Sequence, residues 1–220
     1  MQPNLNPPSR RDKTTARDLF AQPTTWDELV AGADSLTGTG PIELEIGSGK
    51  GLFLLAASAQ RPTHAFFGIE LAAKFANGAA DRLAKHQRTN ATVLRGDAQK
   101  FLAQVIPADS LAAIHVYFPD PWWRNKHKKR RVLNESAIMD IQRSLLPEGQ
   151  LHFWTDVLDY YEHICSQVME LTTLAGPKFV PQRAAAHSMD YTTHFERRAR
   201  THGQPVYRAL FVKPALSHHS

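Results

Sequence analysis

The chain has 220 residues, which is enough for one well-buried core and too short for two domains of average size. It carries 26 lysine and arginine residues against 21 aspartates and glutamates, a net charge of +5. Six of the basic residues stand between Arg124 and Arg131, where there is no acid, so the rest of the chain is nearly balanced at 20 against 21. Positive charge concentrated in one segment indicates an anionic partner that contacts one face of the protein. Charge that served only solubility would be spread over the chain.

Cysteine usage and hydropathy limit the compartment. The chain has one cysteine, Cys165, which has no partner for an intrachain disulfide, and its apolar helical surroundings predict a core residue rather than a nucleophile. The N-terminal segment lacks the apolar stretch of a signal peptide, and no apolar run approaches the roughly 18 residues of a membrane-spanning helix. We therefore expect a soluble, cytoplasmic protein with no membrane partner.

The elements follow a repeating order along the chain. Residues 1–17, rich in proline, asparagine and charge, predict a flexible tail before a single domain over residues 18–220. After a short helix that Thr25 can cap, strand and helix alternate five times. Strands are expected at 42–46, 64–70, 91–96, 111–118 and 150–155, and helices at 51–60, 72–87, 98–106, 135–146 and 157–173. This order predicts an α/β fold, a parallel sheet with helices on both faces, which the runs at 177–181 and 206–212 extend as an antiparallel edge pair.

A glycine-rich turn follows the first of these five strands. Gly47, Gly49 and Gly51 lie in the stretch EIGSGKG, where glycine permits positive φ and a close approach by a ligand. Acids end the next two strands: Glu70 is placed to accept ribose hydroxyls, and Asp97 to meet an adenine amine. Each acid alone is more often a helix cap or a solvated loop residue. Acids at successive strand ends nevertheless indicate the crevice where open parallel sheets bind their ligands.

The residues around this turn separate two kinds of nucleotide cofactor. The dinucleotide fingerprint requires glycine at position 52, where this chain has Leu52. Glu45, on the strand before the turn, would repel a pyrophosphate but would attract the cationic methionine portion of S-adenosylmethionine. The sequence therefore favours S-adenosylmethionine over a nicotinamide cofactor.

FPDPWWRNKHKKRR, residues 118–131, joins an acid to the basic segment. It follows the strand expected at 111–118, so it lies at the mouth of the same crevice. Prolines on both sides of Asp120 restrict the backbone and exclude a helix, which presents the carboxylate from a rigid support. We expect Asp120 to belong to the site, the alternative being an acid that merely ends a strand in a proline-rich turn.

These motifs together resemble those of the tRNA (guanine-N7-)-methyltransferase family. The matching pieces, in that family's order over residues 41–212, are EIGSGKG, GIE, RGDA, FPDPW with HKKRR, the TD pair at 155–156 and THFE at 193–196. FPDPW with its basic run and THFE are the specific pieces. The resemblance implies a Rossmann-like class I fold with a mostly parallel seven-stranded sheet, S-adenosylmethionine as cofactor, and methyl transfer to N7 of a guanosine in the tRNA variable loop.

The resemblance also implies roles for individual residues. Asp120 is the implied catalytic residue. Cofactor contacts are expected from Glu45, Gly47, Gly49, Glu70, Asp97 and Asp120, and substrate contacts from Arg124, Asp156, Thr193, His194, Phe195 and Glu196. From its position beside the pocket, the basic run is expected to hold RNA phosphates through Lys126, Lys128, Lys129, Arg130 and Arg131. The family commonly has lysine where this chain has Arg124. The planar guanidinium group of arginine therefore replaces the compact ammonium group of lysine.

The chemistry of guanine is consistent with acids at this site. N7 carries a lone pair in the plane of the base, so its methylation requires no general base. A nearby carboxylate can instead stabilise positive charge as it passes from the sulfonium to the purine. Asp156 and Glu196 can accept the ring N–H and the amino group of guanine. Their alternatives are a helix N-cap for Asp156 and a local ion pair for Glu196.

Two other functions stay open at this point. An amino-methyltransferase acting on adenine or on a protein amide uses a related DPPY or NPPY loop, although the order PDPW argues against it. A catalytically silent RNA-binding protein of the same fold is disfavoured by the complete set of acids at the strand ends. His115 is expected to be a satisfied interior histidine, and the 11 histidines show no metal-ligand spacing, so we expect no metal. The partners expected are therefore tRNA and, in a homodimer, a second copy; a monomer is equally compatible.

Overall fold

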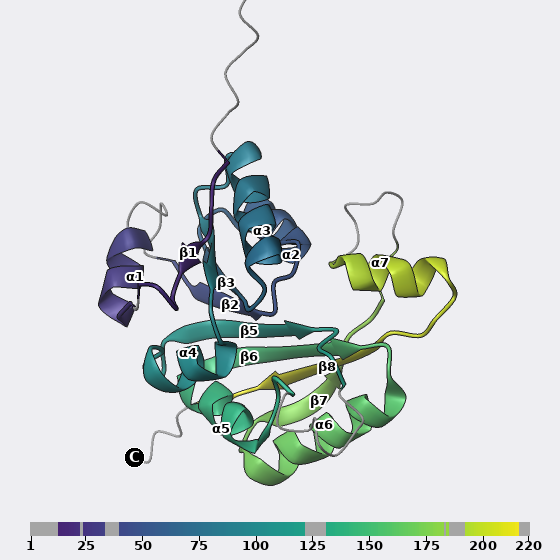
Figure 1. The fold of residues 1–220 in the computed structure, drawn as a ribbon. Coiled ribbons are helices and arrows are strands. Elements are labelled where there is room, and N and C mark those ends of the chain that lie inside the picture. The colour runs from purple at the N-terminus through teal and green to yellow at the C-terminus, as the bar shows by residue number, and fades with distance from the viewer. Residues whose placement is uncertain are drawn as a thin grey trace, which may run out of the picture.

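A computed structural model of the protein describes residues 13–22, 24–33, 40–121, 131–182, 184 and 192–215. One eight-stranded sheet forms its centre, with the strand order β1-β4-β3-β2-β5-β6-β8-β7 (Figure 1). The pairs from β1 to β6 are parallel, and β8 runs antiparallel to both of its neighbours. The strands are β1 Arg17–Asp18, β2 Ile42–Ile46, β3 Ala65–Glu70, β4 Ala91–Arg95, β5 Leu111–Tyr117, β6 Leu145–Thr155, β7 Ala175–Phe179 and β8 Tyr207–Val212.

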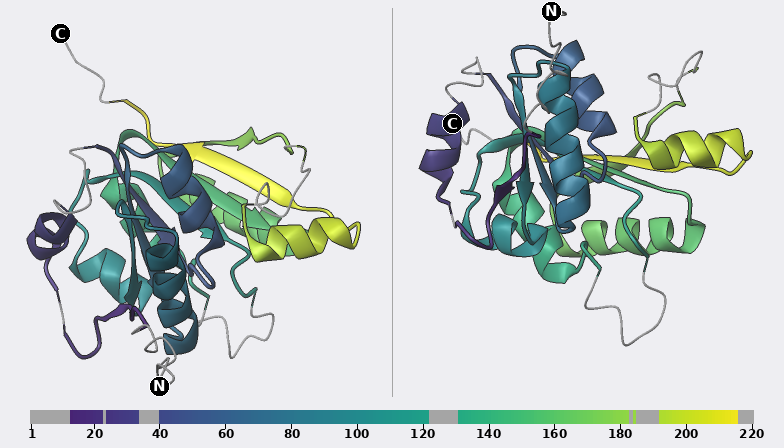
Figure 2. Two further views of the ribbon diagram at one scale, coloured as in Figure 1. Left: turned by 90° about the horizontal axis from the view of Figure 1, so that it is seen from above. Right: turned by 45° about the horizontal axis from the view of Figure 1, so that its top comes forward.

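Helices cover both faces of this sheet, as Figures 1 and 2 show. They are α1 Trp26–Ala33, α2 Leu52–Gln60, α3 Ala73–Lys85, α4 Ala98–Gln104, α5 Glu135–Ser144, α6 Leu158–Leu171 and α7 His194–Thr201. The helices α2 and α3 lie on one face, and α4, α5 and α6 on the other. The helix α7 lies beyond the carboxyl ends of β5 and β6, on the opposite side of the strands from α6.

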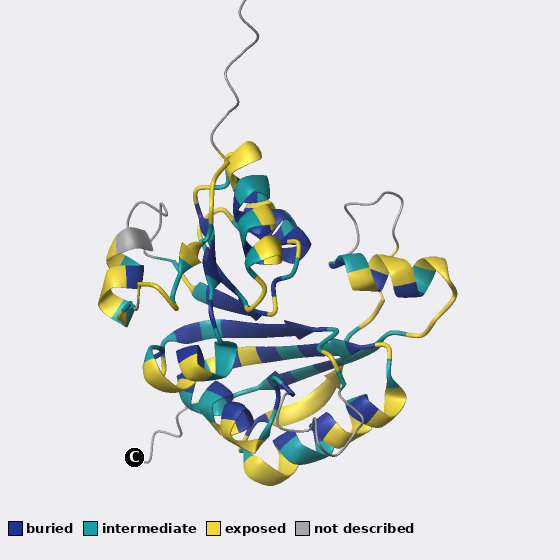
Figure 3. Ribbon diagram, in the orientation of Figure 1, coloured by how far each residue is buried: buried dark blue, intermediate teal, exposed yellow. Residues whose placement is uncertain are grey.

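The central strands are buried on both faces, which is why their sequences are almost continuously apolar (Figure 3). Alternate residues of β3 enter two different cores: Phe66 packs with the residues of α2 and α3, and Phe67 packs on the α4–α6 side. Cys165, only 5% exposed on α6, belongs to the second core, as predicted. Burial raises the pKa of its thiol to about 11, which leaves the thiol protonated and unreactive.

Capping residues set several helix starts. Thr25 and Glu28 form a reciprocal capping box at α1, with Thr25 Oγ1 3.3 Å from the Glu28 N–H and Glu28 Oε2 3.1 Å from the Thr25 N–H. Asn134 Oδ1 accepts from the Ala137 N–H at 2.9 Å and so begins α5. The cap predicted at Thr25 is confirmed.

The predicted fold class is confirmed, with one additional element at each end of the domain. The short strand β1 is an eighth strand, in which Arg17 pairs with Leu94 and Asp18 with Arg95. The boundary expected after residue 17 therefore falls inside a strand, because backbone pairing and the Asp18–Arg95 ion pair hold this segment against β4. The helix α7 forms in a stretch that the sequence marks only as polar.

Candidate active site

The glycine turn between β2 and α2 is the floor of the site. Gly47, Gly49 and Gly51 have φ of +75°, +51° and +69°, a region that favours glycine. A Cβ atom on Gly47 would meet no atom within 4 Å, whereas one on Gly51 would lie 2.8 Å from the Ala79 Cβ. Gly47 therefore leaves open backbone for a ligand, and Gly51 lets α2 start close to α3.

Glu70 ties the end of β3 to this turn. Its Oε2 accepts the Gly49 N–H at 2.9 Å, and its Oε1 accepts the Ala72 N–H at 2.8 Å. These two bonds fix the carboxylate at the carboxyl edge of the sheet. Each oxygen keeps a lone pair, so the predicted contact with ribose hydroxyls is still available to it.

Glu45 is the most unusual acid of the site. It is 3% exposed, and its Oε2 has no hydrogen-bond partner among the described residues. Burial, followed by the charge of Glu70, raises its pKa well above the usual value of 4.5. A buried carboxyl group with one unpartnered oxygen suits a ligand that brings a positive charge. The open backbone at Gly47 and this orphaned oxygen therefore fit S-adenosylmethionine.

Asp97 caps the helix that follows β4. Its Oδ1 accepts from the Gln99 N–H at 2.9 Å and from the Lys100 N–H at 3.3 Å. The alternative considered from the sequence, a helix cap, is thus present. It does not exclude an adenine contact through Oδ2, because Asp97 lies half-buried at the next strand end from Glu70.

The loop that holds Asp120 has a strained backbone at Phe118. Phe118 has φ of +50°, which for a bulky side chain costs about 1 to 3 kcal/mol. Its N–H donates to the Trp154 carbonyl at 2.7 Å, and its ring stacks on Phe195 with centroids 6.1 Å apart and planes 22° apart. These contacts turn the chain sharply out of β5 and leave the Asp120 side chain exposed at the carboxyl edge.

Arg131 holds the far end of the same loop. It is 9% exposed, its Nε donates to the Pro121 carbonyl at 2.8 Å, and its guanidinium lies 5.3 Å from the centroid of the Tyr160 ring. These contacts connect Arg131 to Pro121 and, on α6, to Tyr160, and its phosphate contact stays a prediction. The other predicted phosphate residues, with Arg124, lie at 122–130, outside the described residues.

The THFE motif begins α7. Thr193 Oγ1 accepts the Glu196 N–H at 3.0 Å, and Glu196 Oε2 accepts the Thr192 N–H at 2.7 Å. Glu196 Oε1 pairs with Arg208 at 2.9 Å and with Arg200 at 3.3 Å. Glu196 is 3% exposed and both of its oxygens are engaged, so the alternative considered from the sequence, an ion pair, is present, and the guanine contact stays a prediction.

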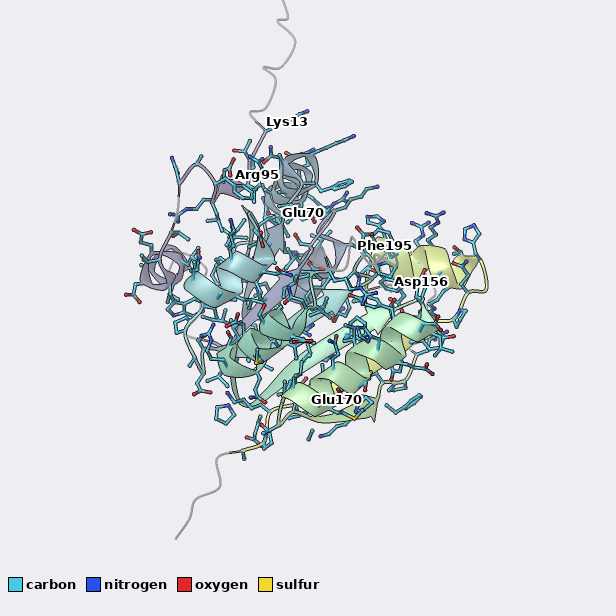
Figure 4. The ribbon with its side chains drawn as sticks, turned by 60° about the horizontal axis from the view of Figure 1, so that its bottom comes forward. Lys13, Glu70, Arg95, Asp156, Glu170 and Phe195 are labelled. Atoms are coloured by element: carbon cyan, nitrogen blue, oxygen red, sulfur yellow. The ribbon has the colours of Figure 1, made fainter. Side chains whose placement is uncertain are left out.

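His194 and Phe195 differ in their exposure. His194 is half-buried; burial, then the charges of Lys50 and neighbouring arginines, lowers its pKa, which indicates a neutral imidazole beside the glycine turn. Phe195 is 57% exposed and presents the outer face of the Phe118–Phe195 stack. In Figure 4, Phe195 and Asp156 lie on the same side of the molecule, with Glu170 at the far end of α6.

Asp156 is not the cap of α6. The helix starts at Leu158 after Val157, and the Val157 N–H is accepted by Thr155 Oγ1 at 3.3 Å. The capping alternative for Asp156 is therefore wrong, because Thr155 makes the local bond. The Asp156 side chain is exposed, which leaves it available to a substrate.

A polar cluster that the sequence analysis did not assign lies on the sheet face beside α2. It lines a cavity of about 530 Å³, away from the glycine turn. Glu43 receives His64 Nδ1 at 2.6 Å, His115 Nε2 at 2.7 Å and Arg61 at 3.0 Å, and His115 Nδ1 lies 2.9 Å from the Tyr117 hydroxyl. Burial alone would raise the pKa of Glu43, but these partners lower it to about 2. The cluster satisfies its own charges and confirms His115 as an interior histidine. The alternating acids of IELEI were its signal in the sequence.

The fold and the site define a class I methyltransferase that uses S-adenosylmethionine. A family model described as "Putative methyltransferase" matches residues 39–209. The chain is 46% identical over 212 residues to the tRNA (guanine-N(7)-)-methyltransferase of Rhodopirellula baltica, covering 92% of this chain and 78% of that one. It is 34% identical over 177 residues to the Myxococcus xanthus enzyme of the same name, covering 80% and 85%. The chain belongs to the tRNA (guanine-N7-)-methyltransferase family.

A solved structure adds a likeness of fold. The aminoglycoside resistance methyltransferase NpmB1 matches with a TM-score of 0.55 at 16% identity, covering 86% of this chain and 93% of that chain. At this identity the match concerns the arrangement of strands and helices. Among the described helices, none has the length and apolar character needed to span a bilayer.

Proposed function

We propose that this protein transfers the methyl group of S-adenosylmethionine to N7 of a guanosine in the variable loop of tRNA, in the cytoplasm. The observation that carries the proposal is the placing of Asp120. Asp120 follows the strained residue Phe118 directly after β5, whose neighbour β2 carries Glu45, in a chain of this family, and this supports a role for Asp120 at the cofactor. The basic segment of residues 124–131 follows Asp120 in the sequence.

The cofactor would be held by the six residues expected from the sequence, Glu45, Gly47, Gly49, Glu70, Asp97 and Asp120. Gly47 permits close approach of the methionine portion, and Glu45 is positioned to neutralise its positive charge. Glu70 accepts from the ribose, and Asp97 from the adenine amine. When bound, S-adenosylmethionine supplies an electrophilic methyl group on a positively charged sulfur.

Asp120 then acts as an electrostatic group rather than as a base. The lone pair of N7 is free without proton removal, so the carboxylate has no proton to take. It stabilises positive charge that moves onto the purine, and the loop supports it in a fixed place. The exposed ring of Phe195 provides a surface on which the guanine can stack, and the exposed Asp156 can accept from its Watson–Crick edge.

The RNA is held by cations around this centre. The residues predicted to contact phosphates follow Asp120 closely in the sequence; they include Lys126, Lys128, Lys129 and Arg130. Arg197 and Arg198 are exposed on α7, close in sequence to Phe195, and add two further cations that can contact phosphates. Phosphate contacts of this kind position an RNA without reading its sequence, while the pocket selects the base.

The nature of the modified nucleoside tests the proposal. A tRNA transcript is incubated with the protein and with S-adenosylmethionine labelled in its methyl group, then digested to nucleosides and separated. We expect the label in 7-methylguanosine. Label in a methylated adenosine, or in protein rather than RNA, would instead support an amino-methyltransferase, and no transfer at all would support a silent RNA-binding protein.

A further inference from the structure

A second, smaller cavity lies at the edge of the sheet where β7 and β8 meet α6. Its volume is about 280 Å³, and its lining includes three aromatic side chains, Tyr161, Phe179 and Tyr207. Phe179 is 88% exposed, and every residue of β7 is exposed (Figure 3). The exposed ring of Phe179 lines this cavity together with two tyrosine rings, and an aromatic surface of this kind marks a site of interaction.

This cavity opens at the same end of the sheet as the methyl-transfer site. Tyr207 lies opposite Thr155, the residue before Asp156, and Phe179 lies opposite Ala209 on the next strand. Tyr161 stands in the first turn of α6, just after Asp156. From β6 to β7 is two strand spacings, roughly 10 Å. A nucleotide adjacent to one held at Asp156 would therefore reach the cavity.

The chemistry of the lining suits a flat, neutral group. The rings of Tyr161 and Tyr207 lie 5.8 Å apart at 38°, and Phe179 adds a third apolar wall. The guanidinium of Arg208 is already engaged by Glu196 at 2.9 Å and by the Val206 carbonyl at 3.0 Å. The exposed amide of Gln182 can donate to and accept from polar edges. This combination favours a nucleobase over a phosphate, because among the described residues of the lining the one cation, Arg208, is already neutralised.

We propose that this cavity binds an unpaired nucleobase of the tRNA, a neighbour of the methylated guanosine, by stacking on Phe179 and the two tyrosines. The proposal rests on the proposed function, since it takes the RNA to be the substrate. It assigns to the edge strand a role in RNA affinity and in the choice of site. The chemistry of methyl transfer stays with Asp120 and the glycine turn.

The test compares Phe179→Ala with Phe179→Trp, which keeps a stacking surface, and with Met169→Ala. Met169 is a similarly apolar side chain, 51% exposed on α6, outside the lining of the cavity. Phe179→Ala is expected to raise the Kd and the KM for tRNA by about fivefold to a hundredfold. The other two variants should stay within twofold of the unaltered protein, as should kcat at saturating tRNA and the Kd for S-adenosylmethionine in all three.

A second measurement identifies the base. Transcripts with an abasic site at each unpaired position next to the target are bound by the unaltered protein and by Phe179→Ala. One abasic transcript should bind the unaltered protein more weakly than the intact transcript does. Phe179→Ala should bind that abasic transcript and the intact transcript with equal affinity.

Three results bear on the proposal separately. Equal tRNA affinity of Phe179→Ala and the unaltered protein would overturn it. A change from dimer to monomer in Phe179→Ala by analytical ultracentrifugation, with tRNA affinity retained, would also overturn it and make this edge a contact between two copies. If tRNA binding depended on Phe179 but no 7-methylguanosine formed, the proposed function would fail while the base-binding cavity stood.

Discussion

Two carboxylates of the site, Glu45 and Asp120, lie in opposite surroundings. Glu45 is buried with an unpartnered oxygen and a raised pKa, whereas Asp120 is exposed on a strained loop. A buried acid whose pKa is raised suits the proposed role of Glu45 in binding a cation. An exposed acid held on a rigid support is placed to act on the acceptor.

The first prediction concerns a proton on Glu45. In the cofactor-free protein its raised pKa means that it still carries a proton at pH values above the usual 4.5. A cation beside it favours the charged form, so its pKa falls and a proton leaves on binding. Calorimetric titration with S-adenosylmethionine in two buffers of different ionisation enthalpy should show this release over a pH series that starts at 4.5.

Glu45→Gln should remove the proton release and weaken binding of S-adenosylmethionine by tenfold or more, as expected for about 1.5 kcal/mol from a charged hydrogen bond. Glu162→Gln, a change of the same kind at an exposed position of α6, is the control. Identical heats in both buffers for the unaltered protein would show that Glu45 is not the group that meets the cation.

The second prediction separates chemistry from binding at Asp120. Asp120→Asn keeps the shape of the side chain and removes its charge, so it should lower kcat by about a hundredfold to a thousandfold. The Kd for tRNA should change by less than threefold, because the phosphate contacts are elsewhere. Asp27→Asn, at an exposed position on α1, should change neither quantity. A loss of tRNA affinity equal to the loss of turnover would contradict this division of roles.

At the scale of elements, α7 is a helix held by charge. Of its residues, Glu196 and Ala199 are buried, and the anchor of the helix is the ion pair from Glu196 to Arg208 on β8. The Arg208 guanidinium also lies 4.8 Å from the centroid of the Trp154 ring. This anchoring holds Phe195 against Phe118, and through Phe118 it supports the loop of Asp120.

The third prediction tests this anchor by a double-mutant cycle. Glu196→Gln and Arg208→Gln should each lower the free energy of unfolding by about 2 to 3 kcal/mol, because each removes the charged partner of a buried group. The double variant should lose clearly less than the sum of the two. Chemical denaturation measures all three, and the KM for tRNA should follow the same pattern. If Glu196→Gln lost activity at unchanged stability, the guanine contact expected from the sequence would be supported.

The elements themselves show what a sequence can and cannot reveal. The alternating strands and helices from Ile42 to Leu171 were predictable because apolar periodicity reports burial directly. The helix α7 was not, because its burial depends on Glu196, a residue that pattern analysis counts as exposed. The strand β1 is two residues long, below the length at which any pattern shows.

Some features of the site could likewise be predicted from the sequence, and others could not. Glu45, Glu70 and Asp97 were predictable because strand ends of a parallel sheet converge on one edge. The sequence could not show which acids already have partners. Arg208, the partner of Glu196, lies 12 residues further along the chain, on the strand β8. The burial of Arg131 against Tyr160 was hidden for the same reason: a basic residue at the end of a basic run looks exposed until the chain folds back.

For the molecule as a whole, we propose that separate residues perform methyl transfer and hold the RNA. The fourth prediction concerns the residues that hold the RNA. Replacing Lys128 and Lys129 by alanine should weaken tRNA binding and reduce the slope of log Kd against log salt concentration by about one to two units. Lys85→Ala, which removes a charge from the exposed end of α3, should leave the slope unchanged. A loss of affinity with an unaltered slope would show that these lysines do not contact phosphates.

The fifth prediction addresses the atom that receives the methyl group, which is the central claim. Two tRNA transcripts are prepared that differ only at the target position, one with guanosine and one with 7-deazaguanosine, in which carbon replaces N7. Each is incubated with the protein and with S-adenosylmethionine labelled in its methyl group. The account predicts labelling of the guanosine transcript and none of the 7-deazaguanosine transcript, with both bound at similar affinity. Equal labelling of the two transcripts would contradict it.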